Sequence, residues 1–142
     1  MGMKTGKFSV TTGTRMEFVD ITSLVQKEVN NSDIRDGLCY VYNPHTTAGL
    51  TINEGADPAV QDDIVGVLKQ VIPPNYPYKH MEGNSPAHIM ASLMGSSVTV
   101  FVENGRLVLG TWQKIFFCEF DGPRSRKVIC KVVSVLFELN YF

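Results

Sequence analysis

From Ser97 to Phe120 the chain reads SVTVFVENGRLVLGTWQKIFFCEF, and from Lys127 to Leu139 it reads KVICKVVSVLFEL. β-branched and aromatic residues dominate both stretches, as is typical of strands. Asn104-Gly105 is a strong hairpin signal, because a type I′ turn needs positive φ at both central residues. We therefore predict four antiparallel strands in series, over residues 97–102, 106–110, 112–120 and 127–139. A doubly wound parallel sheet is excluded, because its strands would alternate with helices along the whole chain.

The residues before Ser97 add helices and further strands. Lys7–Thr11 and Arg15–Val19 favour a hairpin around the turn Thr12-Gly13-Thr14. Apolar residues at helical spacing predict helices near 21–29, 58–71 and 85–94, and short strands are expected over 38–42 and 50–52. The predicted fold is α+β, with antiparallel or mixed sheets that form a sandwich or partial barrel and two to three helices packed on one side. We expect residues 1–142 to form a single domain.

Composition limits the class of function. The 142 residues include 13 basic and 14 acidic side chains, and no block of like charge is present. This balance argues against binding to nucleic acid or to a membrane, and it favours a small partner. Cys39, Cys118 and Cys130 lie in apolar runs without CxxC spacing, so we expect reduced core residues. The polar N-terminus and the lack of a long apolar segment indicate a cytoplasmic protein.

The densest chemistry lies in HMEGNSPAHIMASL, residues 80–93. In an extended backbone His80, Glu82 and Asn84 would project from one face. Each of these residues alone has a plainer interpretation, as solvated surface or as part of a helix cap. Because two of the three histidines of the chain occur here with a carboxylate and an amide between them, the cluster favours a functional site.

The same segment predicts a helix N-terminus. Ser85 is the expected N-cap and Pro86 the first helical residue, which places His88 in the first turn. An imidazole beside the free N–H groups of a helix, with a second imidazole just upstream, suits either a metal ion or a phosphate.

Two further loops carry polar side chains. His45, Thr46 and Thr47 lie between two predicted strands, where a rigid scaffold often displays functional groups, although a polar turn is the plainer interpretation. The basic cluster at residues 121–127 is interpreted as a solvated loop, in which Arg124 or Arg126 could still contact an anion.

One predicted strand carries polar residues on an otherwise apolar face. Gln113 and Glu119 share that face with Ile115 and Phe117. Either the two polar groups are buried with partners, or an edge strand leaves them in water.

Three blocks of sequence resemble one family. They are PHTTAGLTINE at 44–54, HMEGNSPAH at 80–88, and GRL through GTWQ to EFDGPR within 105–124. Together they are similar to the YjbQ-type family, also called the secondary thiamine-phosphate synthase enzyme family. The resemblance implies a compact α+β protein with curved antiparallel sheets, commonly a homotrimer, with motif residues near a subunit boundary. It also implies an enzyme that joins an aminopyrimidine methyl diphosphate to a thiazole phosphate and releases diphosphate.

The resemblance carries over residue by residue. The matching polar motif residues are His45, Asn53, Glu54, His80, Glu82, Asn84, His88, Gln113 and Glu119. We assign catalytic roles to His45, Glu54, Glu82 and Glu119. Substrate binding is assigned to Thr46, Thr47, Asn53, Asn84, Ser85, Gln113 and Arg124. Residue chemistry, rather than the resemblance, makes His45, His80 and His88 the candidate metal ligands.

These residues support two hypotheses. In the first, the protein is an enzyme in which a divalent metal ion and cationic side chains neutralise a departing diphosphate. In the second, it binds a metal or a small anion without turnover. Zinc would favour the histidines, whereas magnesium would favour Glu54, Glu82 or Glu119. We expect no organic cofactor. Because the sequence contains neither a Walker-type glycine loop nor a Gly-x-Ser-x-Gly elbow, it does not support nucleotide binding or serine-hydrolase chemistry.

Overall fold

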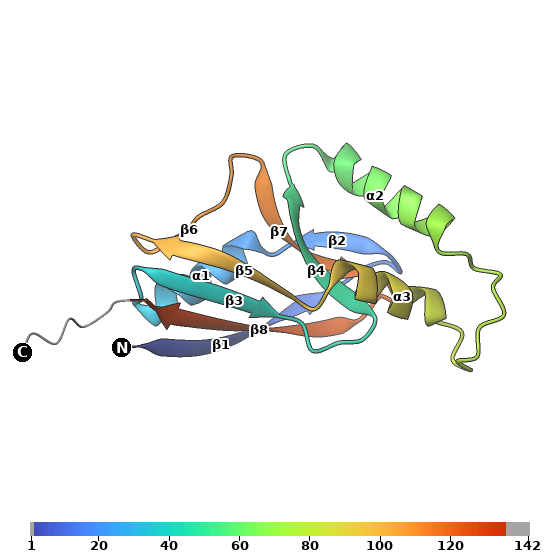
Figure 1. The fold of residues 1–142 in the computed structure, drawn as a ribbon, viewed down its shortest axis with the longest axis horizontal. Coiled ribbons are helices and arrows are strands. Elements are labelled where there is room, and N and C mark those ends of the chain that lie inside the picture. The colour runs from blue at the N-terminus through green and yellow to red at the C-terminus, as the bar shows by residue number, and fades with distance from the viewer. Residues whose placement is uncertain (1, 136–142) are drawn as a thin grey trace, which may run out of the picture.

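A computed structural model describes residues 2–135. The elements in chain order are β1 (Met3–Thr11), β2 (Glu17–Asp20), α1 (Thr22–Ser32), β3 (Gly37–Tyr42), β4 (Ala48–Glu54), α2 (Pro58–Val71), α3 (Ser85–Met94), β5 (Ser97–Glu103), β6 (Arg106–Leu107), β7 (Gln113–Glu119) and β8 (Ser125–Ser134) (Figure 1). The strands form a larger sheet in the order β1-β8-β3-β5-β6 and a smaller one in the order β2-β7-β4, and neighbouring strands are antiparallel. The predicted α+β class is confirmed.

β7 is the central strand of the smaller sheet and is buried on both faces. Ile115 and Phe117 join the core that lies between the two sheets and α1. Phe116 and Cys118 point to the other side, where they pack with residues of α3. Alternate side chains of one strand therefore belong to two hydrophobic cores. The next residue on the first face is Glu119, whose side chain is fully buried.

The predicted N-terminal hairpin is wrong, although both of its strands exist. β1 pairs with β8 along its whole length, starting with Met3 opposite Val133. β2 pairs instead with β7 in the smaller sheet. The local turn signal did not decide the pairing, because each strand finds its partner in a different sheet, with residues that lie more than 95 positions further along the chain.

The C-terminal strands are only partly as predicted. The Asn104-Gly105 hairpin is confirmed, with φ angles of 51° and 75°, and it joins β5 to β6. The series of four neighbouring strands is wrong, because β7 crosses to the smaller sheet and β8 returns to a position between β1 and β3. Residues 108–110 are not in a strand, and β8 begins at Ser125, two residues earlier than predicted. The predicted continuation over 136–139 lies outside the described residues.

α2 begins as predicted. Asp57 is its N-cap, and Oδ1 of this residue accepts the N–H of Ala59 at 3.0 Å. No residue of α2 is fully buried, and Figure 1 places this helix beside α3 at one end of the molecule. No helix in the described part of the chain combines the length and apolar composition needed to cross a membrane.

α3 packs closely on β4. The N–H of Leu50 donates to the carbonyl of Gly95 at 3.0 Å. A Cβ placed on Gly49 would stand 2.6 Å from Cβ of Met94, so only glycine permits this approach. Because α3 carries His88, the contact fixes the position of one predicted site residue.

Candidate functional site

One pocket collects most of the predicted site residues. It has a volume of about 400 Å³ and is lined by Pro44, His45, Thr46, Thr47, His80, Glu82, Asn84, His88, Asp121, Arg124 and Arg126. Three separate segments supply this lining: the β3–β4 loop, the turn before α3 with its first helical turn, and the β7–β8 connection with the start of β8. The fold therefore brings together polar residues that are far apart in the sequence.

Asn43 shapes the β3–β4 loop. Its side chain is buried, its Oδ1 accepts the N–H of His45 at 2.9 Å, and its Nδ2 donates to the carbonyl of Ala48 at 2.7 Å. An asparagine that bonds to the backbone two residues further on forms an Asx turn. This anchored turn holds His45 at the pocket.

His45 is held as a neutral hydrogen-bond donor. Its Nε2 accepts the backbone N–H of Lys127 at 2.8 Å. In a neutral imidazole one nitrogen accepts and the other carries the hydrogen, so Nδ1 is the donor. Burial and the charge of Arg126 lower the pKa of His45, and the nearby Glu119 carboxylate opposes them only in part. This tautomer has no free lone pair for a metal ion, so the geometry favours contact with an anion over the predicted role as a ligand.

Glu119 and Arg126 form a buried ion pair behind the pocket wall. Nε of Arg126 donates to Oε1 of Glu119 at 2.8 Å, and Nη2 donates to Oε2. The carboxylate also accepts from Oγ1 of Thr12 at 2.7 Å and from the N–H groups of Phe120 and Asp121 at 3.1 Å. Burial raises the pKa of Glu119, but the hydrogen bonds from Arg126, Thr12 and Asp121 outweigh burial and hold the pKa below its ordinary value. With its oxygens taken up in this way, Glu119 positions Arg126 rather than acting as the predicted catalytic group.

Both arginines of the pocket are oriented by carboxylates. Besides bonding Glu119, Nη2 of Arg126 donates to Oγ1 of Thr47 at 2.9 Å, which leaves the two N–H groups of Nη1 for a ligand. Arg124 pairs with Asp121 through Nη2 and Oδ2 at 3.0 Å, and its Nε donates to the carbonyl of Asp121 at 2.7 Å. Burial raises the pKa of Asp121, but the hydrogen bonds and charges around it lower the pKa overall, so this carboxylate is ionised.

Asn84 is the N-cap residue of α3 in place of the predicted Ser85, yet its side chain does not bond the helix. Its Nδ2 donates instead to Oδ2 of Asp121 at 3.0 Å. Because an ionised carboxylate only accepts, this bond fixes the orientation of the amide and turns Oδ1 away from Asp121. Oδ1 of Asn84 is buried and has no hydrogen-bond partner in the described chain. An unsatisfied buried acceptor usually costs about 1–3 kcal/mol of stability.

The N-terminus of α3 offers fewer donors than predicted. Pro86 has no N–H, and the N–H groups of Ala87 and His88 donate to the carbonyl of Asn84 at 3.0 and 3.3 Å. Only the N–H of Ser85 is left in this first turn. Ser85 lines a neighbouring pocket, which shares His80 and His88 with the main pocket. The helix end therefore offers few free N–H donors for an anion.

His80, Glu82 and His88 lie near one another at the rim. Residues 81–83 form a turn instead of the predicted extended segment, and Nε2 of His80 is 3.8 Å from Oε2 of Glu82. The rings of His80 and His88 are nearly perpendicular, with centroids 5.3 Å apart. Among residues 2–135, no three His, Cys, Asp or Glu side chains are arranged to hold a metal ion. Two imidazoles and a carboxylate are nevertheless suitable zinc donors, and the side chains of His80 and Glu82 are 46% and 74% exposed, so they are free to rotate.

Three predicted residues lie away from the pocket. Asn53, Glu54 and Gln113 are at the opposite end of the smaller sheet, where Glu54 pairs with Gln113, while Ala48 pairs with Glu119 near the site. Six residues of strand span roughly 20 Å. Gln113 is exposed and Glu119 is buried with partners. The edge-strand alternative is wrong, because β7 is the central strand of its sheet, and burial with partners holds for Glu119 alone.

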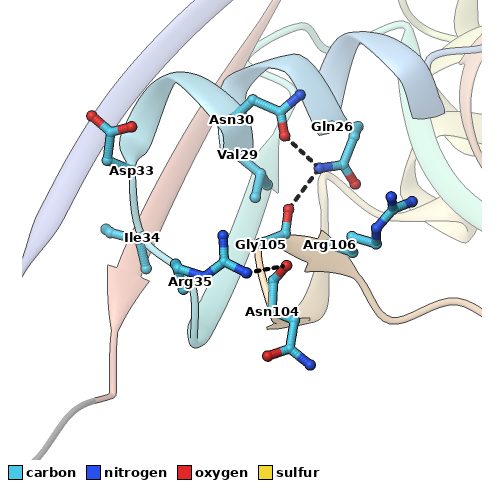
Figure 2. Close-up of a pocket in the computed structure, with 9 residues that line it drawn as sticks. All are labelled: Gln26, Val29, Asn30, Asp33, Ile34, Arg35, Asn104, Gly105 and Arg106. Carbon is cyan, nitrogen blue, oxygen red and sulfur yellow. Dashed lines mark hydrogen bonds between the residues drawn. The ribbon is translucent and has the colours of Figure 1, made fainter.

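A second polar pocket, of about 480 Å³, lies between the end of α1 and the β5–β6 turn (Figure 2). Nε2 of Gln26 donates to Oδ1 of Asn30 and to the carbonyl of Gly105, both at 2.9 Å. Nη2 of Arg35 donates to the carbonyl of Asn104 at 3.2 Å. These bonds tie the hairpin to the helix, so we interpret the pocket as structural.

Asp121 was not predicted as a site residue, and Arg126 was expected in a solvated loop where it could contact an anion. A signal for Arg126 exists, because it continues the alternation of the buried residues Val128, Cys130 and Val132. Starting the last strand two residues earlier would have placed this arginine on the buried face. For Asp121 the sequence carries no comparable signal.

Comparisons with known proteins agree with the fold and the motifs. A sequence model of the family described as "UPF0047 protein YjbQ-like" matches residues 6–135. A UPF0047 protein of Methanocaldococcus jannaschii is 49% identical over 128 residues, which cover 90% of this chain and 93% of the relative. The UPF0047 protein YugU of Bacillus subtilis is 48% identical over 88% of this chain and 96% of its own.

Solved structures of YjbQ-like proteins have a similar fold. The crystal structure of a conserved YjbQ/UPF0047 protein from Clostridium acetobutylicum has a TM-score of 0.87 at 56% identity, covering 89% of this chain and 98% of that one. A protein of unknown function from Sulfolobus solfataricus has a TM-score of 0.88 at 33% identity, covering 93% of this chain and 97% of that one. The chain therefore belongs to the YjbQ-like UPF0047 family.

Proposed function

We propose that the protein is an enzyme that binds a phosphorylated small molecule in this pocket and promotes the departure of diphosphate. One observation carries the proposal: donors suited to an anion share the pocket with two further imidazoles and a carboxylate. The anion donors are the guanidinium groups of Arg124 and Arg126, Nδ1 of His45 and the hydroxyl of Thr46. Donors that are fixed before the reaction stabilise developing negative charge most effectively.

His80, Glu82 and His88 would hold a divalent metal ion. Their nitrogen and oxygen atoms favour zinc, and a metal bound there would supply positive charge beside the leaving group. His45 is left out of this set, because its Nε2 accepts the N–H of Lys127.

Two of the four predicted catalytic residues line the pocket. Nδ1 of His45 carries the hydrogen that can be donated to an anion, and Glu82 is an exposed carboxylate 3.8 Å from His80. Glu82 is therefore the candidate for a direct role as a metal ligand, beside the leaving group. Glu119 acts indirectly, by holding Arg126 in place.

The resemblance to the thiamine-phosphate synthase enzyme family suggests the specific reaction to test. The methylene carbon of the aminopyrimidine loses its bond to the diphosphate oxygen and gains a bond to the thiazole nitrogen. Purified protein is incubated with both phosphorylated precursors and either magnesium or zinc, and the coupled product is measured. We expect product with the wild type and with Lys69→Ala on α2, and a strong loss with Glu82→Gln. Background coupling by wild type and Glu82→Gln alike would rule out this chemistry.

A binding protein without turnover is the second candidate. It is favoured by the two preformed ion pairs, which hold the arginines rigidly in place as a receptor would. Tight binding of phosphate or zinc by wild type, together with background coupling, would support this function.

A further inference from the structure

The charges that line the pocket nearly cancel. Arg124 and Arg126 contribute two positive charges, and Glu82 and Asp121 contribute two negative ones. Since both arginines are already paired with carboxylates, net attraction alone selects poorly among anions of similar size. Selection must then depend on individual hydrogen-bonding atoms in the pocket wall.

Oδ1 of Asn84 is a hydrogen-bond acceptor that lacks a donor within the described chain. Asn84 lines the pocket and is 9% exposed, and its Oδ1 is buried without a hydrogen-bond partner in the described chain. The amide cannot turn over to relieve this, because its Nδ2 is held by the carboxylate of Asp121. It cannot cap α3 either, since Pro86 has no N–H and the N–H of Ala87 bonds the main-chain carbonyl of Asn84.

We propose that Asn84 is a specificity-determining residue, and that its Oδ1 accepts a hydrogen bond from the bound ligand. The ligand then carries an O–H or N–H donor directly beside its phosphate. This inference rests on the proposed function, in which the pocket takes a phosphorylated small molecule. The inference adds that the ligand must carry a hydrogen-bond donor. The arginines can only donate and the hydroxyl groups can donate, so neither imposes this requirement on a ligand.

A hard metal ion is a poorer occupant of this position. Magnesium and calcium need about six or more oxygen ligands. Asp121, the carboxylate next to Asn84, is already bonded to Nδ2 of Asn84 and to Arg124. A donor on the ligand completes the bonding of Oδ1 without additional oxygen atoms.

The donor has two possible sources. It is either the P–OH group of the phosphate itself or a hydroxyl or amino group on the neighbouring carbon. Two pairs of probes separate these sources by isothermal titration. Inorganic phosphate is compared with sulfate at about pH 8, where both are mainly dianions of similar shape but only phosphate keeps a proton. The compound 2-hydroxyethyl phosphate is compared with ethyl phosphate, which lacks the hydroxyl.

Asn84→Leu removes the acceptor at nearly constant volume. We expect the wild type to prefer the donor-bearing member of at least one pair by about ten-fold, and Asn84→Leu to reduce that preference to about two-fold or less. Thr46→Val is the matched control, because it removes a pocket hydroxyl but leaves Asn84 intact. It should weaken both members of a pair equally and keep their ratio. If Asn84→Leu does not fold, Asn84→Ala is used in its place, and it should reduce the preference in the same way.

The outcomes separate the two proposals. Equal binding of both members of both pairs by the wild type, or a preference that survives in the Asn84 variant, overturns the role of Asn84 and leaves the anion pocket in place. If the wild type binds none of the four probes, the proposed function fails, and the inference fails with it.

Discussion

Glu119 holds the guanidinium of Arg126 in the pocket wall, so replacing its carboxylate leaves a buried charge without a partner. We expect Glu119→Gln to lower the free energy of unfolding by about 3–5 kcal/mol, as measured by urea denaturation. Glu103→Gln, at an exposed position on β5, should change it by less than about 0.5 kcal/mol. A Glu119 variant as stable as the Glu103 control would mean that Arg126 has another partner.

His45 gives the protein a dependence on pH. Its pKa in the folded state lies below the ordinary value of 6.5, so the unfolded chain takes up the proton first as the pH falls. The stability from neutral His45 is fully present above about pH 6.5 and is lost as the pH falls below it, until both states are protonated. We expect the stability advantage of wild type over His45→Gln to shrink between about pH 7 and pH 5. An advantage independent of pH over that range would contradict the assigned tautomer.

His80 and His88 lie at the pocket rim, where they contribute to neither hydrophobic core. We expect His80→Ala and His88→Ala to abolish binding of zinc, while the stability of the metal-free protein changes by no more than about 0.5 kcal/mol. Titration calorimetry and thermal unfolding test the two parts. A large fall in the melting temperature of metal-free protein would show that the histidines are structural.

Many site residues were predictable one by one from the sequence. The predicted residues that line the main pocket are His45, Thr46, Thr47, His80, Glu82, Asn84, His88 and Arg124. Their roles were harder to predict. The tautomer of a histidine and the hydrogen bonds of a carboxylate depend on partners that are distant in the sequence. Lys127 sets the tautomer of His45 in this way, and Thr12 and Arg126 satisfy Glu119.

At the scale of elements, the close approach of α3 to β4 depends on Gly49. A Cβ at this position would lie 2.6 Å from Cβ of Met94 and 3.1 Å from the carbonyl of Gly95. We expect Gly49→Ala to cost about 1–3 kcal/mol in urea denaturation. It should also weaken zinc binding, because a displaced α3 moves His88.

Gly66→Ala on α2 is the matched control for Gly49→Ala. An added Cβ there meets no atom within 4 Å, and alanine is the better helix former, by about 1 kcal/mol. Gly66→Ala should therefore be neutral or stabilising. If Gly49→Ala behaves in the same way, α3 is not locked to β4.

Elements were predicted well where their signals are local. The turn at Asn104-Gly105 and the limits of the helices predicted over 58–71 and 85–94 depend on a few adjacent residues, and all are confirmed. Strand pairing is not local. Nothing near β1 indicates that it pairs with β8, because that choice depends on which arrangement buries the most apolar surface over the whole chain.

At the scale of the molecule, the outer face of the larger sheet carries a row of apolar side chains. Met3, Val133, Leu38 and Phe101 are neighbours across four strands, and Phe101 is 62% exposed. The strand predicted over 127–139 continues past this row, but residues 136–142 lie outside the described part. A continuous apolar row of this kind is typical of a surface that binds another chain.

We propose that this face joins copies of the protein in a symmetric oligomer, and the resemblance suggests a trimer. Light scattering at micromolar concentration should give a mass above that of one chain. Phe101→Lys should lower the mass toward the monomer, whereas Val67→Lys on the exposed side of α2 should not. A monomeric wild type would contradict the proposal.

β8 lies between β1 and β3, although it is the last strand of the described chain. During synthesis on the ribosome, β1 and β3 are made early and keep unpaired edges until residues 125–134 emerge. Arg126 emerges with the same strand, so an inner strand of the larger sheet and a cationic group of the pocket are synthesised together. A nascent chain that stalls before Ser125 would expose one edge each of β1 and β3, where other chains can pair. Its pocket would lack Arg126. In this fold, the pairing of β1 and β3 and the completion of the pocket therefore depend on the same ten residues of β8.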